Sequence, residues 1–385
     1  FGRTGTVDWD TTAKTASFTA VNGEGYFINS AGGQITVTLP SSPSAGNIVS
    51  ISDYNGTAST NPITIARNGS NINGSATNLE ISKNNSAIEL VYVDGTTGWQ
   101  SVATANTVDI QSSFLTATGG TITCCGDYKI HTFTGPGTFT VCTVGGVSDN
   151  NIVSYLVVAG GASGGSSEGG GGGAGGFREY KGPADSYTAS PLNGNPGGTA
   201  ITVTSQAYPI TVGAGGATVG PSPSSNGNPG SNSVFSTITS AGGGGGGGGA
   251  DVNGLDGGSG GGGAHSSGSA GNGNVPPVSP AQGKSGANPA PGTGPAPSDS
   301  GGGGGGATAV ANPAPTGRAG GAGATTSING TPTARAAGGD GGGASGPAGT
   351  PQTANTGNGA PRGGAPGNAG GTGGSGIVII RYKFQ

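Results

Sequence analysis

Side chains able to do chemistry are few in this 385-residue chain, and they stand apart from one another. One of its two histidines, His131, falls in the alternating run Lys129–Phe133, which predicts a packed strand residue. The other, His265, has no acid or nucleophile near it in sequence. Glycoside hydrolysis needs paired carboxylates, and only four aspartates and no glutamate follow Asp185. We therefore expect no enzyme and no catalytic residue.

The three cysteines are Cys124, Cys125 and Cys142. Three thiols without a partner set of histidines and cysteines make a poor zinc site, so no metal and no cofactor is expected. A cross-strand bridge to Cys142 could start from Cys124 or from Cys125. A disulfide between Cys124 and Cys142 is the possible bridge we consider. Because the number of cysteines is odd, one thiol stays unpaired in either case.

Aromatic and charged side chains gather at Phe177, Arg178, Tyr180 and Lys181, with Tyr187 a few residues later. Aromatic and arginine side chains often dominate recognition surfaces, so this cluster is a candidate for binding. The alternative is a strand that covers the rest of the domain. The full candidate set for receptor binding is Phe177, Arg178, Tyr180, Lys181, Tyr187, His265 and Lys284.

Composition limits what can position these residues. The chain has 90 glycines and 25 prolines, and only 8% of its residues are charged. Glycine and proline are the two worst helix formers, so essentially no α-helix is expected. A formal charge of −4 without a Lys/Arg cluster gives no field for nucleic acid. No apolar run approaches the length of a membrane span. Because it has no methionine and begins at Phe1, we expect a processed chain or a fragment.

Residues 1–107 predict a small antiparallel β-domain. Turn dipeptides such as Asn55-Gly56 and Asp94-Gly95 separate short runs with alternating hydrophobicity. The runs are Thr15–Val21, Gln34–Leu39, Asn47–Ile51, Ile63–Ala66, Leu79–Ser82, Ile88–Val93 and Trp99–Val102. Aromatic residues including Trp9, Phe27 and Trp99 are expected in the core or at a contact between chains.

Residues 108–158 predict a β-hairpin or meander that opens a glycine-rich module at residues 159–385, closed by a strand at 377–384. Between Ser236 and Gly376 there is no aromatic residue, so hydrophobic burial cannot order this region. Glycine occurs in long runs, such as Gly242–Gly249, but not at every third position as collagen requires. We predict packed polyglycine-II-like helices, whose outward N–H and C=O groups bond neighbouring helices. Strands such as Tyr208–Val212 and Val234–Ile238 would frame them.

Several sequence segments resemble the glycine-rich C-terminal domain of bacteriophage tail-fibre and adhesin proteins. They are Tyr128–Phe133, Gly137–Val141, Tyr155–Gly161, Gly175–Arg178, Tyr208–Gly216, Ser233–Phe235 and Gly373–Tyr382. Four segments nearer the N-terminus resemble a β-domain of marine and cyanophage tail fibres: Gly23–Phe27, Ile35–Pro40, Arg67–Ser70 and Leu90–Asp94. The tip loops of that family are often aromatic-rich, whereas the loops after Phe235 contain no aromatic residue.

The resemblance implies a virion fibre protein located on a phage tail, outside the host cell. By analogy with T-even-type adhesins, loops between polyglycine-II helices would meet a host receptor, either a glycan or an outer-membrane protein. Other virion tail proteins and further copies of the chain, as a homotrimer or a filament, are the other expected partners. Nucleic acid and membrane insertion are not expected. The alternative is a purely structural extracellular filament subunit without receptor recognition.

Overall fold

The computed structural model describes residues 7–104, 110–111, 114–145, 148–197, 199–220, 225–249, 252–265, 267–289, 300–312, 318–342, 347–363 and 367–384. Over these residues the chain is all-β, and its one helical element is the short 3-10 turn η2 (Ser148–Asn151). The prediction of essentially no α-helix is confirmed. Within the described part of the chain, no helix has the length and apolar character needed to span a membrane.

The chain divides into two compact units. The first, called the sandwich unit, comprises Phe1–Phe114 with Val144–Asn150. The second, called the glycine unit, comprises Leu115–Thr143 with Asn151–Gln385. The predicted domain boundary at residues 107 and 108 lies outside the described residues.

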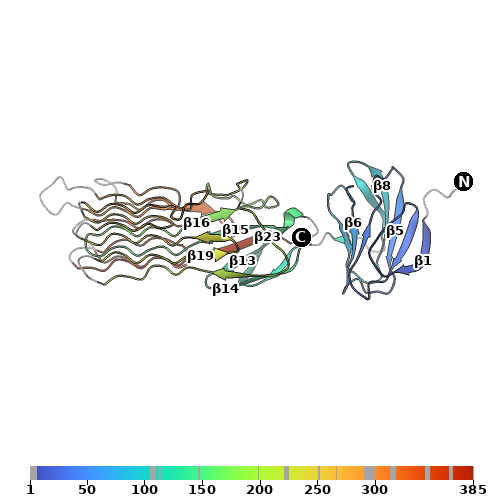
Figure 1. Ribbon diagram of the computed structural model, residues 1–385, viewed down its shortest axis with the longest axis horizontal. Coiled ribbons are helices and arrows are strands. Elements are labelled where there is room, and N and C mark those ends of the chain that lie inside the picture. The colour runs from blue at the N-terminus through green and yellow to red at the C-terminus, as the bar shows by residue number, and fades with distance from the viewer. Residues whose placement is uncertain are drawn as a thin grey trace. The chain divides into compact units, whose positions relative to one another are not determined.

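Two five-stranded sheets make up the sandwich unit (Figure 1). One sheet has, in order, β1 (Asp8–Lys14), β3 (Glu24–Ile28), β5 (Ile48–Asp53), β8 (Ala87–Asp94) and β9 (Gly98–Thr104). The other has β10 (Ile110–Gln111), β7 (Leu79–Ile81), β6 (Ile63–Ala66), β4 (Ile35–Thr38) and β2 (Phe18–Thr19). Alternate residues of both sheets meet in one hydrophobic core that includes Val37, Ile51, Ile65, Leu90 and Trp99.

The expectation of an antiparallel domain is wrong for half of this unit. Strand β1 pairs in parallel with β3 and β3 with β5, while β2 pairs in parallel with β4 and β4 with β6. From β1 to β6 the chain alternates between the two sheets. Two successive strands of the same sheet are therefore separated by one strand of the other sheet. They run in the same direction and pair in parallel. The remaining pairs, β5 with β8, β6 with β7, β7 with β10 and β8 with β9, are antiparallel.

The glycine unit begins and ends in β-strands. One sheet has β11 (Thr116–Thr118), β14 (Gly137–Thr143), β18 (Ala207–Thr211), β19 (Ser233–Phe235) and β20 (Ile238–Ser240). The other has β12 (Thr121–Cys125), β13 (Tyr128–Phe133), β23 (Ile377–Lys383), β15 (Ile152–Val158) and β16 (Phe177–Tyr180), with β17 (Ile201–Thr202) paired to β15. A separate hairpin joins β21 (Ala324–Thr326) and β22 (Thr333–Arg335).

Strand β23 lies between β13 and β15, so the last strand of the chain is central in its sheet. Val157 and Val378 face one hydrophobic cluster, while Leu156 and Ile379 face another on the opposite side. This sheet is therefore buried on both faces. A near-continuous apolar run such as the one ending at Ile380 is what such a strand requires.

Between the strands, the glycine segments form rods with a repeat of three residues. In the rod at residues 159–167, N–H groups three residues apart donate to the same neighbouring segment. The pairs along one side join Gly160 to Ser231, Ser163 to Asn228 and Ser166 to Ser225, at N···O distances of 3.0 to 3.2 Å. A helix with three residues per turn that is antiparallel to its neighbour gives this pattern.

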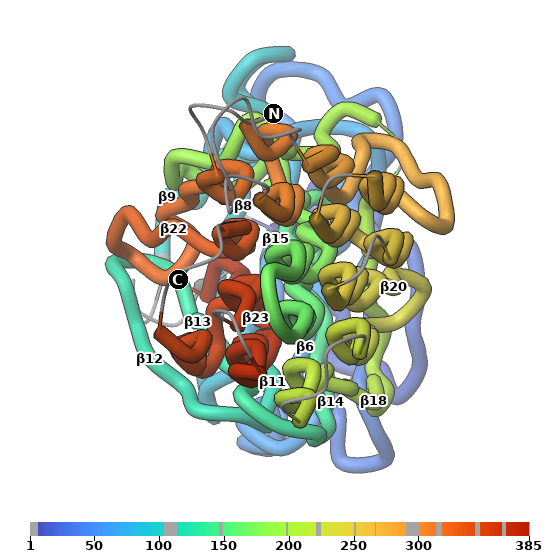
Figure 2. The backbone as a smooth tube through the Cα atoms, turned by 90° about the vertical axis from the view of Figure 1, so that its left-hand side faces the viewer, coloured from blue at the N-terminus to red at the C-terminus, as the bar shows by residue number. Residues whose placement is uncertain are grey.

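The remaining sides of the same rod bond to other segments. N–H groups on its second and third sides donate to residues 368–374 and 170–176. Its carbonyl oxygens accept hydrogen bonds from residues 243–249 and 360–363. Figure 2 shows such rods end-on, as coils packed side by side. The glycine unit is thus a bundle of polyglycine-II-like helices framed by β-strands, as the sequence predicts.

Side chains are excluded from most positions in this bundle because the backbones touch. A Cβ atom added at Gly262 would lie far closer than van der Waals contact to the carbonyl oxygen of Gly302. The N–H of Gly262 donates to Gly171, and its carbonyl accepts from Gly247. The absence of a side chain is therefore what lets these backbone groups find each other.

Candidate functional site

The rods extend from the β-strands to an opposite end of the bundle (Figure 1). The rod at 159–167 leaves β15, and the rod at 170–176 returns to β16. The rods between β18 and β19 likewise leave the strands and return to them, and the last rod leads back into β23. The end opposite the strands is called the bundle tip. Its described residues include Ser167, Glu168, Gly220, His265, Arg318, Asp340, Arg362 and Gly367.

Hydrogen bonds tie neighbouring turns of the bundle tip together. The N–H of Ser167 donates to the carbonyl of Asn368 at 3.3 Å, and the N–H of Gly367 donates to the hydroxyl of Ser167 at 2.9 Å. The N–H of His265 donates to the carbonyl of Glu168 at 3.4 Å. These bonds hold residues about 100 or 200 positions apart in sequence against each other, so these three segments form one surface.

The charges of the bundle tip interact. The Glu168 carboxylate lies 3.3 Å from Nε2 of His265. Burial lowers the pKa of Arg362, the charge of Arg318 lowers it further, and the charge of Glu168 opposes both effects. The guanidinium groups of Arg318 and Arg362 and the carboxylate of Glu168 therefore interact electrostatically, and the carboxylate also contacts the imidazole of His265. Such a cluster stands out in a chain with few charges overall.

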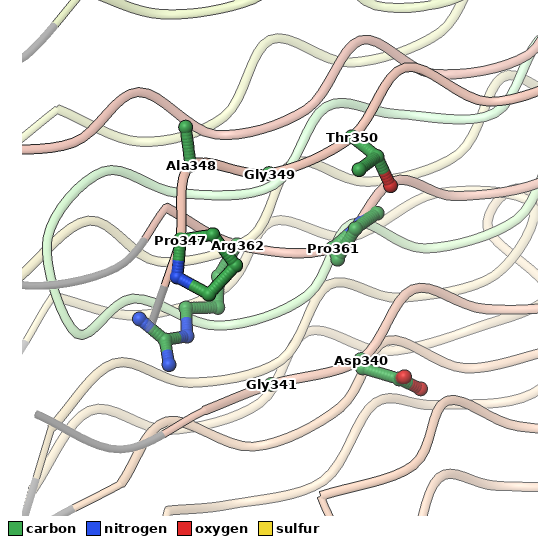
Figure 3. Close-up of a pocket in the computed structure, with 8 residues that line it drawn as sticks. All are labelled: Asp340, Gly341, Pro347, Ala348, Gly349, Thr350, Pro361 and Arg362. Atoms are coloured by element: carbon green, nitrogen blue, oxygen red, sulfur yellow. The ribbon is translucent and has the colours of Figure 1, made fainter. Parts of the chain in front are cut away.

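A shallow cleft of about 210 Å³ opens among three rod segments beside this cluster (Figure 3). Its lining residues are Asp340, Gly341, Pro347, Ala348, Gly349, Thr350, Pro361 and Arg362. Nη1 of Arg362 donates to the carbonyl of Gly363 at 2.7 Å, and the backbone N–H of Arg362 donates to the carbonyl of Asp340 at 3.2 Å. Asp340 Oδ1 accepts from the N–H of Gly320 at 2.9 Å.

The cleft offers hydrogen bonds and ionic contacts from Asp340, Thr350 and Arg362. The lining contains no serine, cysteine, histidine or lysine, and Asp340 is its one carboxylate. Across the described residues, no group of three or more His, Cys, Asp or Glu side chains could hold a metal ion.

Most residues of the predicted receptor-binding set lie elsewhere. Phe177, Arg178 and Tyr180 are buried in β16, and Tyr187 is buried as well. Phe177 and Tyr187 belong to one core cluster of the glycine unit, and Tyr180 belongs to another. These aromatic side chains therefore pack the strands and present no surface in this structure.

The three remaining candidates are half-buried. Nζ of Lys181 lies 5.8 Å from the ring of Tyr187. Lys284 lies on a rod that starts beside β16, since the carbonyl of Gln282 accepts from the N–H of Phe177. Only His265 lies at the bundle tip. Sequence reasoning missed Glu168, Arg318, Asp340 and Arg362, although an isolated charge next to a glycine-rich run was the available signal.

The possible disulfide between Cys124 and Cys142 does not form in this structure, where all three cysteines are free. Cys124 is exposed on β12, at the edge of the six-stranded sheet, and Cys142 is exposed on β14 in the other large sheet. The two strands do not pair, so the cross-strand geometry that a bridge would need is missing.

Comparison with known families gives one match. A family model described as "Glycine-rich domain" matches residues 132–383, which cover the described rods and most of the strands that frame them. No curated protein matches the chain.

Proposed function

The chain belongs to the glycine-rich domain family, and on that premise we propose that it is a non-enzymatic fibre or adhesin protein of a bacteriophage tail. In this proposal the glycine unit presents the bundle tip to a receptor on the host cell surface. The location is the virion, outside the host cell. The partners are the receptor, other tail proteins and further copies of the chain.

The observation that supports this proposal is the separation of scaffold and surface within the glycine unit. The rods hold each other through backbone hydrogen bonds along their length, and the interacting charges lie at the turns. Because backbone hydrogen bonds along the rods hold the scaffold together, substitutions in the turns would leave it intact. A surface that can change without refolding its support suits a protein that must match a variable receptor.

The cleft lined by Asp340 and Arg362 indicates which chemical groups of a receptor the bundle tip could bind. Arginine forms paired hydrogen bonds with carboxylate and phosphate groups, and aspartate accepts hydrogen bonds from hydroxyl groups. Surface glycans and outer-membrane proteins both offer such groups. The alternative function is a structural filament subunit that has no receptor, in which the bundle serves only for rigidity.

Adsorption to cells separates these functions. We expect the fluorescently labelled full-length chain to adsorb to a subset of strains in a panel of intact marine cyanobacteria. Arg318→Ala, which removes an exposed charge at the bundle tip, should weaken adsorption severalfold. Lys284→Ala removes a positive charge near the strands and serves as the matched control. Polymerisation of the chain into filaments, with no adsorption to any strain, would exclude the adhesin.

A further inference from the structure

Three aromatic side chains form a continuous platform on the outside of the sandwich unit. The rings of Trp9 and Phe27 are stacked, with centroids 4.8 Å apart. The ring of Tyr54 meets Phe27 edge to face at 6.3 Å. Trp9 is 39% exposed and Tyr54 is 59% exposed. Aromatic side chains of this size are normally buried, so their exposure on a well-packed sandwich needs an explanation.

Strand β3 shows which face of the sheet carries the platform. Tyr26 and Ile28 of this strand belong to the hydrophobic core. Side chains alternate along a strand, so Gly25 and Phe27 face away from the core. In the paired strand β5, the residues opposite Gly25 and Phe27 are Ser50 and Ser52. The platform therefore shares its face with a row of hydroxyl groups.

Gly25 makes room for the indole of Trp9. A Cβ atom at Gly25 would lie 2.7 Å from the ring, with three ring atoms within 2.9 Å. The indole thus lies face-on against the backbone of β3, with its other face turned away from the strand. A glycine in the middle of a strand costs stability, and here it holds one aromatic ring flat on an exposed sheet.

Polar groups continue from the platform across the sheet. Ser50 Oγ donates to Glu89 Oε2 at 3.1 Å, and Ser50 is paired with Glu89 across β5 and β8. The lysine of the edge strand, Lys14, is held by Asp10 at 2.7 Å. Glu89 thus leaves the surroundings of the platform acidic, which disfavours an anionic ligand and leaves a carboxylate to accept hydrogen bonds.

We propose that this platform binds a neutral glycan built of β-linked pyranose units with equatorial hydroxyl groups. One pyranose unit of such a glycan stacks its flat face of C–H groups on Trp9, and a neighbouring unit contacts Tyr54, whose ring is inclined at 68° to that of Phe27. Ser52 and Glu89 bond the glycan's hydroxyl groups. A second copy of the chain is a poorer occupant. Three partly buried rings of about 200 Å² each offer much less than the roughly 800 Å² per partner that a stable protein interface buries.

Tryptophan fluorescence gives a direct test, because the chain has only two tryptophans and Trp99 is fully buried. In a Trp99→Phe background, titration of the full chain with cellohexaose should change the emission of Trp9 in a saturable way. By calorimetry, Tyr54→Ala should weaken binding roughly fivefold, as expected for one lost aromatic contact. Val102→Ala removes an exposed side chain from β9 of the same sheet and should leave binding unchanged.

Three results would overturn the proposal. They are the absence of saturable binding of cellohexaose to the otherwise unaltered chain, tighter binding of the anionic polymer polygalacturonate, and a dimer in sedimentation that Tyr54→Ala dissociates. Arg318→Ala at the bundle tip should not affect cellohexaose binding. The glycan platform and the proposed receptor surface can therefore fail independently of each other.

Discussion

In the sandwich unit the interior consists of side chains such as Leu90 and Trp99, which are fully buried between two sheets. In the rods of the glycine unit the interior consists of backbone, with N–H and C=O groups of separate rods bonded to one another. The first arrangement gains stability by removing apolar surface from water. The second depends on the close approach that only glycine permits. The two units should therefore respond oppositely to a change in side-chain size.

The largest effect should come from adding one methyl group inside the bundle. In Gly262→Ala the new Cβ would overlap the carbonyl oxygen of Gly302, which belongs to a neighbouring rod and cannot rotate away. Overpacking of a tight core costs about 1–3 kcal/mol and sometimes more. We expect a loss of at least about 3 kcal/mol in the free energy of unfolding, measured by guanidinium titration with circular dichroism.

Gly220→Ala is the matched control for that substitution. A Cβ at Gly220 would have no atom within 4 Å, and the residue does not need a positive φ. The exchange should therefore be neutral or stabilise the chain by about 0.5 kcal/mol. Equal losses at Gly262 and Gly220 would show that the rods do not depend on close backbone contact.

Removing side-chain volume should have its large effect in the sandwich unit. Leu90 is fully buried in that core, so Leu90→Ala should cost about 3 kcal/mol through lost burial and the cavity that remains. In scanning calorimetry the change should appear in the transition of the sandwich unit. A loss confined to the transition of the glycine unit would contradict the assignment of two separate cores.

The same contrast explains how far the sequence could predict the structure. Strands with clear alternation or a long apolar run were predicted within a few residues, as with Ile63–Ala66 and the closing strand at 377–384. Strands β1 and β3 were missed because Trp9 and Phe27 face outward and Gly25 interrupts the pattern. Parallel pairing in the sandwich also escaped prediction, because hairpin-like turn residues say nothing about which sheet receives the next strand.

For the glycine unit the sequence predicted the kind of order but not the arrangement. The rod at 159–167 has only small side chains, such as Ser163, whose hydroxyl accepts from the N–H of Asn228 at 2.7 Å. Small residues of this kind recur throughout the module, so the contact of residue 160 with residue 231 cannot be read from either segment. For the same reason the bundle tip was missed: Glu168 and His265 meet only through the paths of their rods. From the sequence, the aromatic cluster at Phe177 was interpreted as a candidate for an exposed binding surface. Its burial could not be predicted because the strands that cover it are distant in sequence.

Between pH 7.5 and 5, a falling pH should weaken the glycine unit through His131, whereas the sandwich unit contains no histidine to titrate in this range. His131 is fully buried, and burial lowers its pKa, with the carbonyl of Gly119 opposing the shift and the charge of Lys129 adding to it. Its Nε2 lies 3.2 Å from the hydroxyl of Tyr382. The unfolded chain therefore takes up a proton first, as the pH falls below about 6.5.

We expect the unfolding free energy of the glycine unit to fall by up to about 1.4 kcal/mol per pH unit in that window, until the folded state is protonated too. Above pH 7 the free energy should be independent of this group. Guanidinium titrations between pH 5 and 7.5 measure the slope, and His131→Phe should remove it. A slope that survives in His131→Phe would assign the acid sensitivity to another group.

The smallest effect should come from taking a methyl group away inside the bundle. Ala264 is fully buried, its N–H donates to Val252 at 3.0 Å, and its carbonyl accepts from Gly268 at 3.1 Å. Ala264→Gly keeps both hydrogen bonds and removes one methyl group, so the loss should be about 1 kcal/mol, from lost burial and added freedom of the unfolded chain. Guanidinium titration of this variant beside Leu90→Ala compares the units directly. A loss as large as that of Leu90→Ala would mean that side-chain burial orders the rods after all, because backbone contact alone predicts a bundle that tolerates smaller residues and rejects larger ones.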